Sequence, residues 1–360
     1  MRGDFLDAID RDFGSLEEFT EYIREDVELN SLDGDLNVIG SVSDFPDRDA
    51  FVRSLETRFD VVRETDDLLL LNSVSKDVPY YVYLHGQFPL FFTTGTKTED
   101  IPKTVDKYLV KEKDMSRMWV SRREMEKIRQ DVTDRHPNIL MPYFSAKRGA
   151  ESDVEAKIRP KKKRTFIYHG DDGLKTFSEL REQYGVLPNN MKFEMPNEFN
   201  FRVSTKGVFT INNGGLRESL TLIERSIKTL TEVKRYIDES EYTEEENKYV
   251  GGGKSRIPKS KPWAIELEKG LTETDVKGFK DSIEMEEWEF TVSRMKPSFE
   301  PEPRFSSVVV DSNNYGRTDL EGTPERIRVY PRENTGIGQS LRLFRFVSEQ
   351  IDPNSRPATV

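Results

Sequence analysis

The 360-residue chain contains no cysteine and only three histidines. The lack of cysteine excludes disulfides, thiol nucleophiles and every cysteine-based metal site. His85, His136 and His169 are far apart in the sequence and form no helical i, i+4 pair, so a histidine-built metal site would need distant segments to meet. The sequence contains no motif of catalytic or cofactor-binding residues that would indicate a particular reaction. We therefore predict no cofactor.

Long apolar runs are also absent. The longest, near Leu68–Leu71, has only the length of a strand, and the first ten residues have no apolar core of signal-peptide length. We therefore expect no membrane partner. A chain without cysteine also fits a reducing compartment, so we expect a cytoplasmic protein.

Charge of opposite sign is concentrated in two parts of the chain. Residues 1–50 hold 15 acidic and 4 basic side chains, which equals the net charge of −11 for the whole chain. Residues 101–169 hold 18 basic and 10 acidic side chains. A solvated acidic helix and a solvated basic face explain this distribution. A basic segment that binds a polyanion, shielded by an acidic segment that itself binds another protein, explains it equally well.

Strand and helix patterns recur along the chain. The clearest is Phe199–Tyr236, which reads as a strand, a turn at Lys206-Gly207, a second strand and a long amphipathic helix. Similar outlines occupy Leu36–Leu109 and Trp263–Ile351. We therefore predict an α+β fold of three units, each with a strand, a helix, antiparallel strands and a helix. The predicted segments are an acidic helical segment at 1–30, a first unit at 31–112, a basic bridge at 113–164, a second unit at 165–238, a linker at 239–261, a third unit at 262–352 and a tail at 353–360.

The end of the first unit carries a resemblance to a known family. Phe92-Thr-Thr-Gly-Thr-Lys97, which leads into the helix that starts near Thr98, resembles the last strand, glycine turn and helix of the TATA-binding-protein-like fold. The resemblance implies a curved antiparallel sheet with a long helix on its convex face. The paired phenylalanine wedges and symmetric asparagines with which that family opens DNA have no match in this chain. No DNA-contacting residue is therefore transferred.

The basic bridge contains the candidate nucleic-acid-binding residues. Lysine and arginine side chains would neutralise phosphates, and aromatic residues on the flanking strands could stack on unpaired bases. A solvated interdomain linker beside core aromatics is the alternative. The leading hypothesis is a non-enzymatic protein that binds DNA or RNA, or a complex that processes them, through Lys147, Arg148, Lys157, Arg159, Lys161, Lys162, Lys163 and Arg164.

Two other functions remain open. His169, Asp171 and Asp172 follow a predicted strand, and this arrangement of carboxylates could hold a divalent metal in a hydrolase or nuclease. A simple turn whose Asp172 caps the next helix explains the same residues. Alternatively, the chain is a scaffold that holds a partner protein through the acidic helices of residues 1–30.

Overall fold

The computed structural model describes residues 15–22, 35–149, 154–160, 162–248 and 254–360. The chain divides into two compact units, Met1–Lys228 and Thr229–Val360, and the boundary falls within one long helix. Helices hold 31% of the residues and strands 36%, so the α+β class is confirmed. Within the described ranges, no helix combines the length and the apolar character that crossing a bilayer requires.

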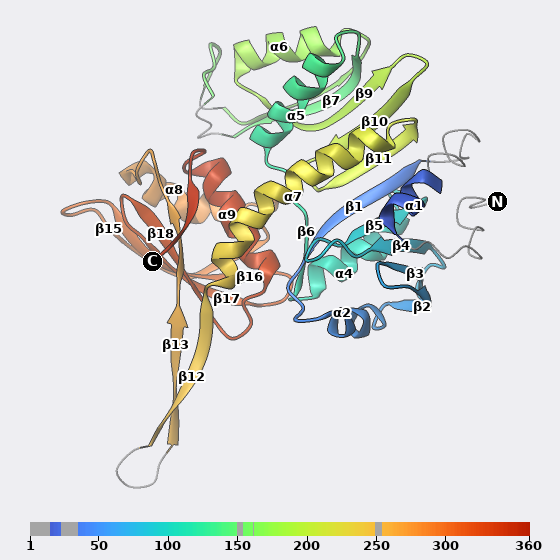
Figure 1. Cartoon of the computed structure of the whole chain (residues 1–360). Helices are drawn as coiled ribbons and strands as arrows, with labels where there is room; N and C mark the ends of the chain where they lie inside the picture. Colours follow the sequence, from blue (N-terminus) through green and yellow to red (C-terminus); the bar gives the residue numbers. More distant parts are fainter. Residues whose placement is uncertain (1–14, 23–34, 150–153, 161, 249–253) are drawn as a thin grey trace. The chain divides into compact units, whose positions relative to one another are not determined.

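The N-terminal unit alternates short helices with antiparallel strands (Figure 1). Its elements are α1 (Leu16–Tyr22), β1 (Leu36–Ser43), α2 (Arg48–Leu55), β2 (Phe59–Glu64), β3 (Leu68–Ser73), β4 (Pro79–Tyr83), β5 (Leu90–Thr93), α3 (Asp100–Lys103), α4 (Val105–Lys111), β6 (Met115–Arg117), α5 (Arg122–Arg135), β7 (Leu140–Arg148), β8 (Arg164–His169), α6 (Gly173–Tyr184), β9 (Leu187–Met195), β10 (Phe199–Ser204), β11 (Val208–Asn213) and α7 (Leu216–Asp238).

One eleven-stranded sheet holds this unit together. Its order is β2-β3-β4-β5-β1-β11-β10-β9-β7-β8, and β6 pairs with the end of β1. The predicted first and second units therefore share a sheet, and the predicted bridge at 113–164 supplies α5 and β7 to it. The prediction of separate units was wrong because β1 has antiparallel partners on both sides, and every one of its residues is buried.

The two halves of the sheet carry helices on opposite faces. Residues directly opposite one another in antiparallel strands point to the same face, so the register defines each face. Ile39 lies opposite Val208, and this Ile39 face is covered by α2, α3 and α4 in the first half. Val38 lies opposite Phe209, and this Val38 face is covered by α5 and α6 in the second half.

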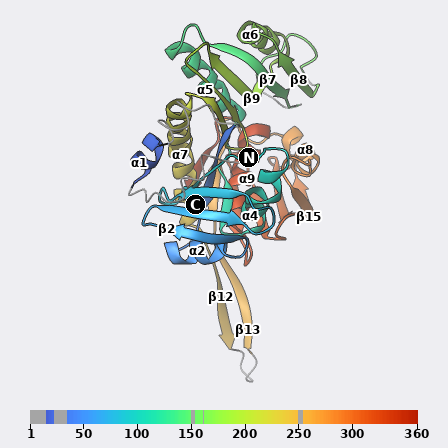
Figure 2. The same cartoon turned by 90° about the vertical axis from the view of Figure 1, so that its right-hand side faces the viewer.

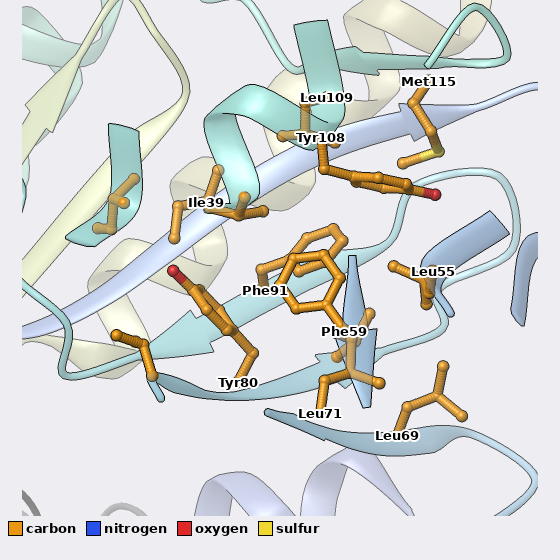
Figure 3. Close-up of a cluster of buried hydrophobic side chains, with 14 of the residues drawn as sticks. Ile39, Leu55, Phe59, Leu69, Leu71, Tyr80, Phe91, Tyr108, Leu109 and Met115 are labelled. Carbon is orange, nitrogen blue, oxygen red and sulfur yellow. The ribbon is translucent and has the colours of Figure 1, made fainter. Parts of the chain in front are cut away.

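The core of the first half lies on the Ile39 face. Phe91 and Tyr80 from the strands meet Phe59 and the α4 residue Tyr108, as Figure 3 shows. The Tyr80 hydroxyl also pairs with that of Thr104 inside the protein. Burial of these large rings provides most of the stability of this layer.

Helix α1 packs on the Val38 face of the first half. Its first turn is capped as the sequence predicts, with the Glu18 amide donating to Ser15 Oγ at 3.1 Å. Phe19 is fully buried, with ring centres 4.9 Å from Tyr81 and 5.2 Å from Phe92. The described part of the acidic segment therefore docks on its own chain. The rest of the segment predicted at 1–30 lies outside the described residues.

The C-terminal unit contains a six-stranded sheet and a separate two-stranded ribbon (Figure 2). The sheet order is β15-β16-β17-β18-β14-β19, and Trp288 and Phe279 pack on Phe346 in its core. The elements are β12 (Glu241–Lys248), β13 (Lys254–Lys261), β14 (Trp263–Glu266), α8 (Glu273–Ile283), β15 (Phe290–Ser298), β16 (Arg304–Asp311), β17 (Arg317–Gly322), β18 (Arg326–Pro331), α9 (Ile337–Gln350) and β19 (Arg356–Thr359).

Two segments of this unit differ from the sequence prediction. The predicted linker at 239–261 forms the ribbon of β12 and β13, in which Glu241 lies opposite Lys261. An oppositely charged cross-strand pair of this kind favours the pairing without the apolar alternation that normally predicts a strand. The predicted tail at 353–360 contributes β19, which pairs with β14 along the sheet edge.

The first half-sheet and the C-terminal unit share one strand order. In each, a strand and a helix precede four antiparallel strands, and the first strand lies beside the last: β1 beside β5, and β14 beside β18. The predicted second unit differs. Its first strand, β8, lies beside β7 at the far edge of the sheet from β11.

Candidate nucleic-acid interface

The predicted basic residues do not form one surface. Arg148 is buried, and its guanidinium donates to three backbone carbonyls: Nε to Pro160 at 2.8 Å, and Nη1 to Val154 at 2.6 Å and Gly185 at 3.0 Å. These hydrogen bonds hold the loop around residue 160 against the end of α6. Arg148 is therefore a structural residue, and the alternation of β7 places it on the helix-covered side.

The neighbouring basic residues line that same loop. Lys157 forms an ion pair with Glu182 of α6, and the Arg164 guanidinium lies 4.5 Å from the ring centre of Tyr184. Arg159, Lys162 and Lys163 are exposed. Lys161 lies outside the described residues. Lys147 alone of the predicted set lies on a strand with its side chain on the Ile39 face, opposite Thr165.

His169, Asp171 and Asp172 do not form a metal site in the structure described. Asp172 accepts hydrogen bonds from Tyr168, which lowers the pKa of this carboxyl, and from Thr176 at 3.3 Å. Asp172 is the N-cap residue of α6, as the alternative from sequence expected, but its side chain bonds these two hydroxyls and makes no capping hydrogen bond to the backbone. In the part of the chain that the structure describes, no three His, Asp or Glu side chains gather as a metal site would require.

The Ile39 face is open in the second half of the sheet, where α5 and α6 cover only the opposite side. One row of side chains crosses five strands there, and its members lie opposite one another in register: His169 on β8, Tyr143 on β7, Lys192 on β9, Arg202 on β10 and Thr210 on β11. We call this set the polar row. His169 is exposed, and Tyr143, Lys192 and Arg202 are partly exposed.

Aromatic and cationic groups contact one another along the polar row. The rings of His169 and Tyr143 have centres 4.9 Å apart. The Arg202 guanidinium carbon lies 4.2 Å from the Tyr143 ring centre, and Arg202 Nε donates to Asn190 Oδ1 at 2.6 Å. Lys192 pairs with Glu194 on the same strand at 3.3 Å. The row therefore presents π surfaces with positive charge between them.

At its Thr210 end, where β11 pairs with β1, the polar row is linked by hydrogen bonds to the first half-sheet. Lys97 Nζ donates to Thr210 Oγ1 at 2.9 Å, and Thr210 in turn donates to Asn37 Oδ1 at 2.9 Å. Burial, followed by the positive charge of Arg202, lowers the pKa of Lys97. Asp35 lies 3.7 Å from Lys97 and partly offsets that effect.

Sequence reasoning missed most of this surface. It named Lys147 and His169 and pointed to Tyr143 as a flanking aromatic, but not Lys97, Lys192 or Arg202. A signal existed: polar residues alternate with buried apolar ones in Leu187–Met195 and Phe199–Ser204. That period-two pattern is typical of a sheet with one solvent-facing side.

Part of this region is similar to a known family. Residues 123–206, which run from α5 to the turn after β10, match a family described as a family middle domain. Over 354 residues, the chain is 25% identical to a protein of Archaeoglobus fulgidus named "Uncharacterized protein", and the match covers 94% of each chain. No solved structure matches the chain.

Proposed function

We propose that this chain is a non-enzymatic binding protein that takes nucleic acid on the open part of the Ile39 face. The contact of Arg202 with Tyr143 at 4.2 Å, in a row that also contains Lys192 and His169, is the observation that carries the proposal. Cationic groups can neutralise phosphates, and flat aromatic groups can stack on bases. The proposal keeps the function inferred from sequence but moves the contact surface from the basic bridge to the sheet.

Competing occupants fit this surface less well. A protein partner would favour a contiguous apolar patch, but the polar row contains charged and hydroxyl-bearing side chains. A hydrolase would need a cluster of metal ligands or a nucleophile with a base, and the polar row offers neither. A cytoplasmic location is part of the proposal, and cell fractionation would test it.

The test compares two double variants that each remove two positive charges. Lys192→Ala with Arg202→Ala removes the cations of the polar row, whereas Lys107→Ala with Lys111→Ala removes exposed cations of α4. Fluorescence anisotropy with labelled RNA and DNA oligonucleotides, measured over a range of salt concentrations, reports affinity. We expect the first variant to bind at least tenfold more weakly, with a salt slope reduced by about 0.7 to 0.9 per lost phosphate contact.

Equal weakening by both variants would show that only net charge matters, and no binding at low salt would refute the proposal. Lys162→Ala with Lys163→Ala tests the original basic-bridge hypothesis in the same assay. Stronger weakening by this third variant would move the site back to the bridge.

We also propose that the first half-sheet and the C-terminal unit are related copies of the TATA-binding-protein-like fold. The common strand order, with β1 beside β5 and β14 beside β18, supports this relationship. An experimentally determined structure would test it, because related copies should superpose over all five strands and the last helix. A different path of the helix over the sheet in one copy would argue against common descent.

A further inference from the structure

The polar row points to the form of nucleic acid that it would bind. We propose that the open part of the Ile39 face binds single-stranded nucleic acid, with unpaired bases stacked on the surface formed by His169, Tyr143 and Arg202. This inference rests on the proposed function. It adds the class of ligand, and it makes Tyr143 a contact residue rather than a core aromatic.

Three side chains with flat π systems lie together on this face. His169, Tyr143 and Arg202 follow one another across the sheet, with 4.9 Å between the two ring centres and 4.2 Å from the ring to the guanidinium carbon. Bases stack on aromatic rings and on guanidinium planes alike. In a duplex the faces of the bases are already stacked on one another, so they could not also stack on these side chains.

The positive charge of this face is partly compensated by carboxylates. Lys192 is paired with Glu194 at 3.3 Å, and Lys97 lies 3.7 Å from Asp35, so two of the cations already have carboxylate neighbours. A duplex on a sheet face would depend on phosphate neutralisation, since an element must enter a groove to read its bases. Few uncompensated charges therefore favour stacking over duplex binding.

Hydrogen bonding is also available beside the stacking surface. The Oδ1 atom of Asn190 accepts from Arg202, which leaves the amide nitrogen of Asn190 as a donor on the same face. Unpaired bases carry acceptors on their exposed edges, which such a donor suits.

The dimensions of the row fit a short strand. It crosses five strands from His169 to Thr210, which at the usual strand spacing is about 19 Å. Lys147 and the exposed Ile167 continue the same face on the neighbouring strands β7 and β8. A few nucleotides lying across the strands would contact His169, Tyr143 and the two cations of the row, whereas Thr210 at its end is buried.

The experiment uses the full-length protein, a labelled 12-nucleotide single strand and a 12-base-pair duplex of the same sequence. We expect the single strand to bind at least tenfold more tightly than the duplex. Tyr143→Ala should weaken single-strand binding about tenfold without changing the salt slope, because stacking releases few counterions. Tyr143→Phe keeps the ring and should bind like the wild type. Thermal melting of each variant verifies that the fold is retained.

The outcomes separate this inference from the function on which it rests. If the duplex binds as tightly as the single strand, or if Tyr143→Ala binds like the wild type, the single-strand inference is wrong while nucleic-acid binding stands. If neither nucleic acid binds, the proposed function fails and this inference fails with it. If Tyr143→Phe loses as much affinity as Tyr143→Ala, the hydroxyl matters rather than the ring, and stacking is refuted.

Discussion

Arg148 Nη1 donates a hydrogen bond to the carbonyl oxygen of Gly185 at 3.0 Å, across 37 positions of sequence. The same guanidinium bonds the carbonyls of Val154 and Pro160. A residue that belongs by composition to a basic patch therefore holds a loop to a helix end. Its loss should affect folding before it affects binding.

Replacing Arg148 with Ala should destabilise the N-terminal unit by about 3 kcal/mol. Three backbone carbonyls would lose their donor, of which that of Gly185 is buried, and each lost hydrogen bond to a charged group costs about 1 kcal/mol or more. Arg148→Lys should restore only part of the stability, because one ammonium group cannot reach all three carbonyls in the same geometry. Urea unfolding measures the change. Lys157→Ala, in the same loop but exposed, should unfold like the wild type, and equal losses for both variants would contradict the structural role.

Gly207 and Gly86 offer a matched pair of turn glycines. Both have positive φ angles, 65° and 56°, but an added Cβ atom at Gly207 would collide with the Met118 carbonyl, whereas Gly86 has nothing within 4 Å. Gly86→Ala should cost only the left-handed backbone strain of about 1 kcal/mol. Gly207→Ala should cost at least twice as much in the same denaturant titration. Equal costs would mean that the turn relaxes away from Met118.

Alkaline pH should destabilise the N-terminal unit. Burial raises the pKa of Tyr81 to about 12 and also raises the pKa values of Tyr80 and Tyr108. Below pH 10 the folded and unfolded chains both keep these protons. Above pH 10 the unfolded chain releases them first, so the free energy of unfolding should fall, for Tyr81 by about 1.4 kcal/mol per pH unit up to pH 12.

Denaturant unfolding between pH 8 and 11 measures this loss. Tyr81→Phe should make the decline shallower, because the phenyl ring keeps its packing on Phe19 and has no proton to release. Tyr315→Phe, which changes a side chain that is 76% exposed, is the control. An unchanged decline in Tyr81→Phe would show that other groups cause the alkaline loss.

Magnesium or manganese ions should leave the melting temperature unchanged. Asp172 is engaged with Tyr168 and Thr176, and the described residues gather no further metal ligands near it. An ion that bound only the folded chain would raise the melting temperature in proportion to its concentration. Such a rise, abolished by Asp171→Ala combined with Asp172→Ala, would revive the hydrolase hypothesis.

The sequence by itself determined the local elements. The turn predicted at Lys206-Gly207 joins β10 to β11, and the long helix predicted after the second strand is α7. Apolar periodicity and turn residues act within a few positions of the chain, so they can be read without the fold. The ribbon of β12 and β13 was missed because its alternating residues are charged and polar.

Only the tertiary structure decided which side chains share a surface. The pairing of Val38 with Phe209 and of Asn37 with Thr210 joins segments more than 170 positions apart. The register of β7, β9 and β10 likewise places Tyr143, Lys192 and Arg202 on one open face. Arg148, on the opposite face, is buried by the loop that it bonds and by the end of α6. The register of long-range strands depends on the summed packing of both faces, which no single stretch of sequence contains. The sequence could therefore supply the residue types of a nucleic-acid interface, but only the sheet could bring them together.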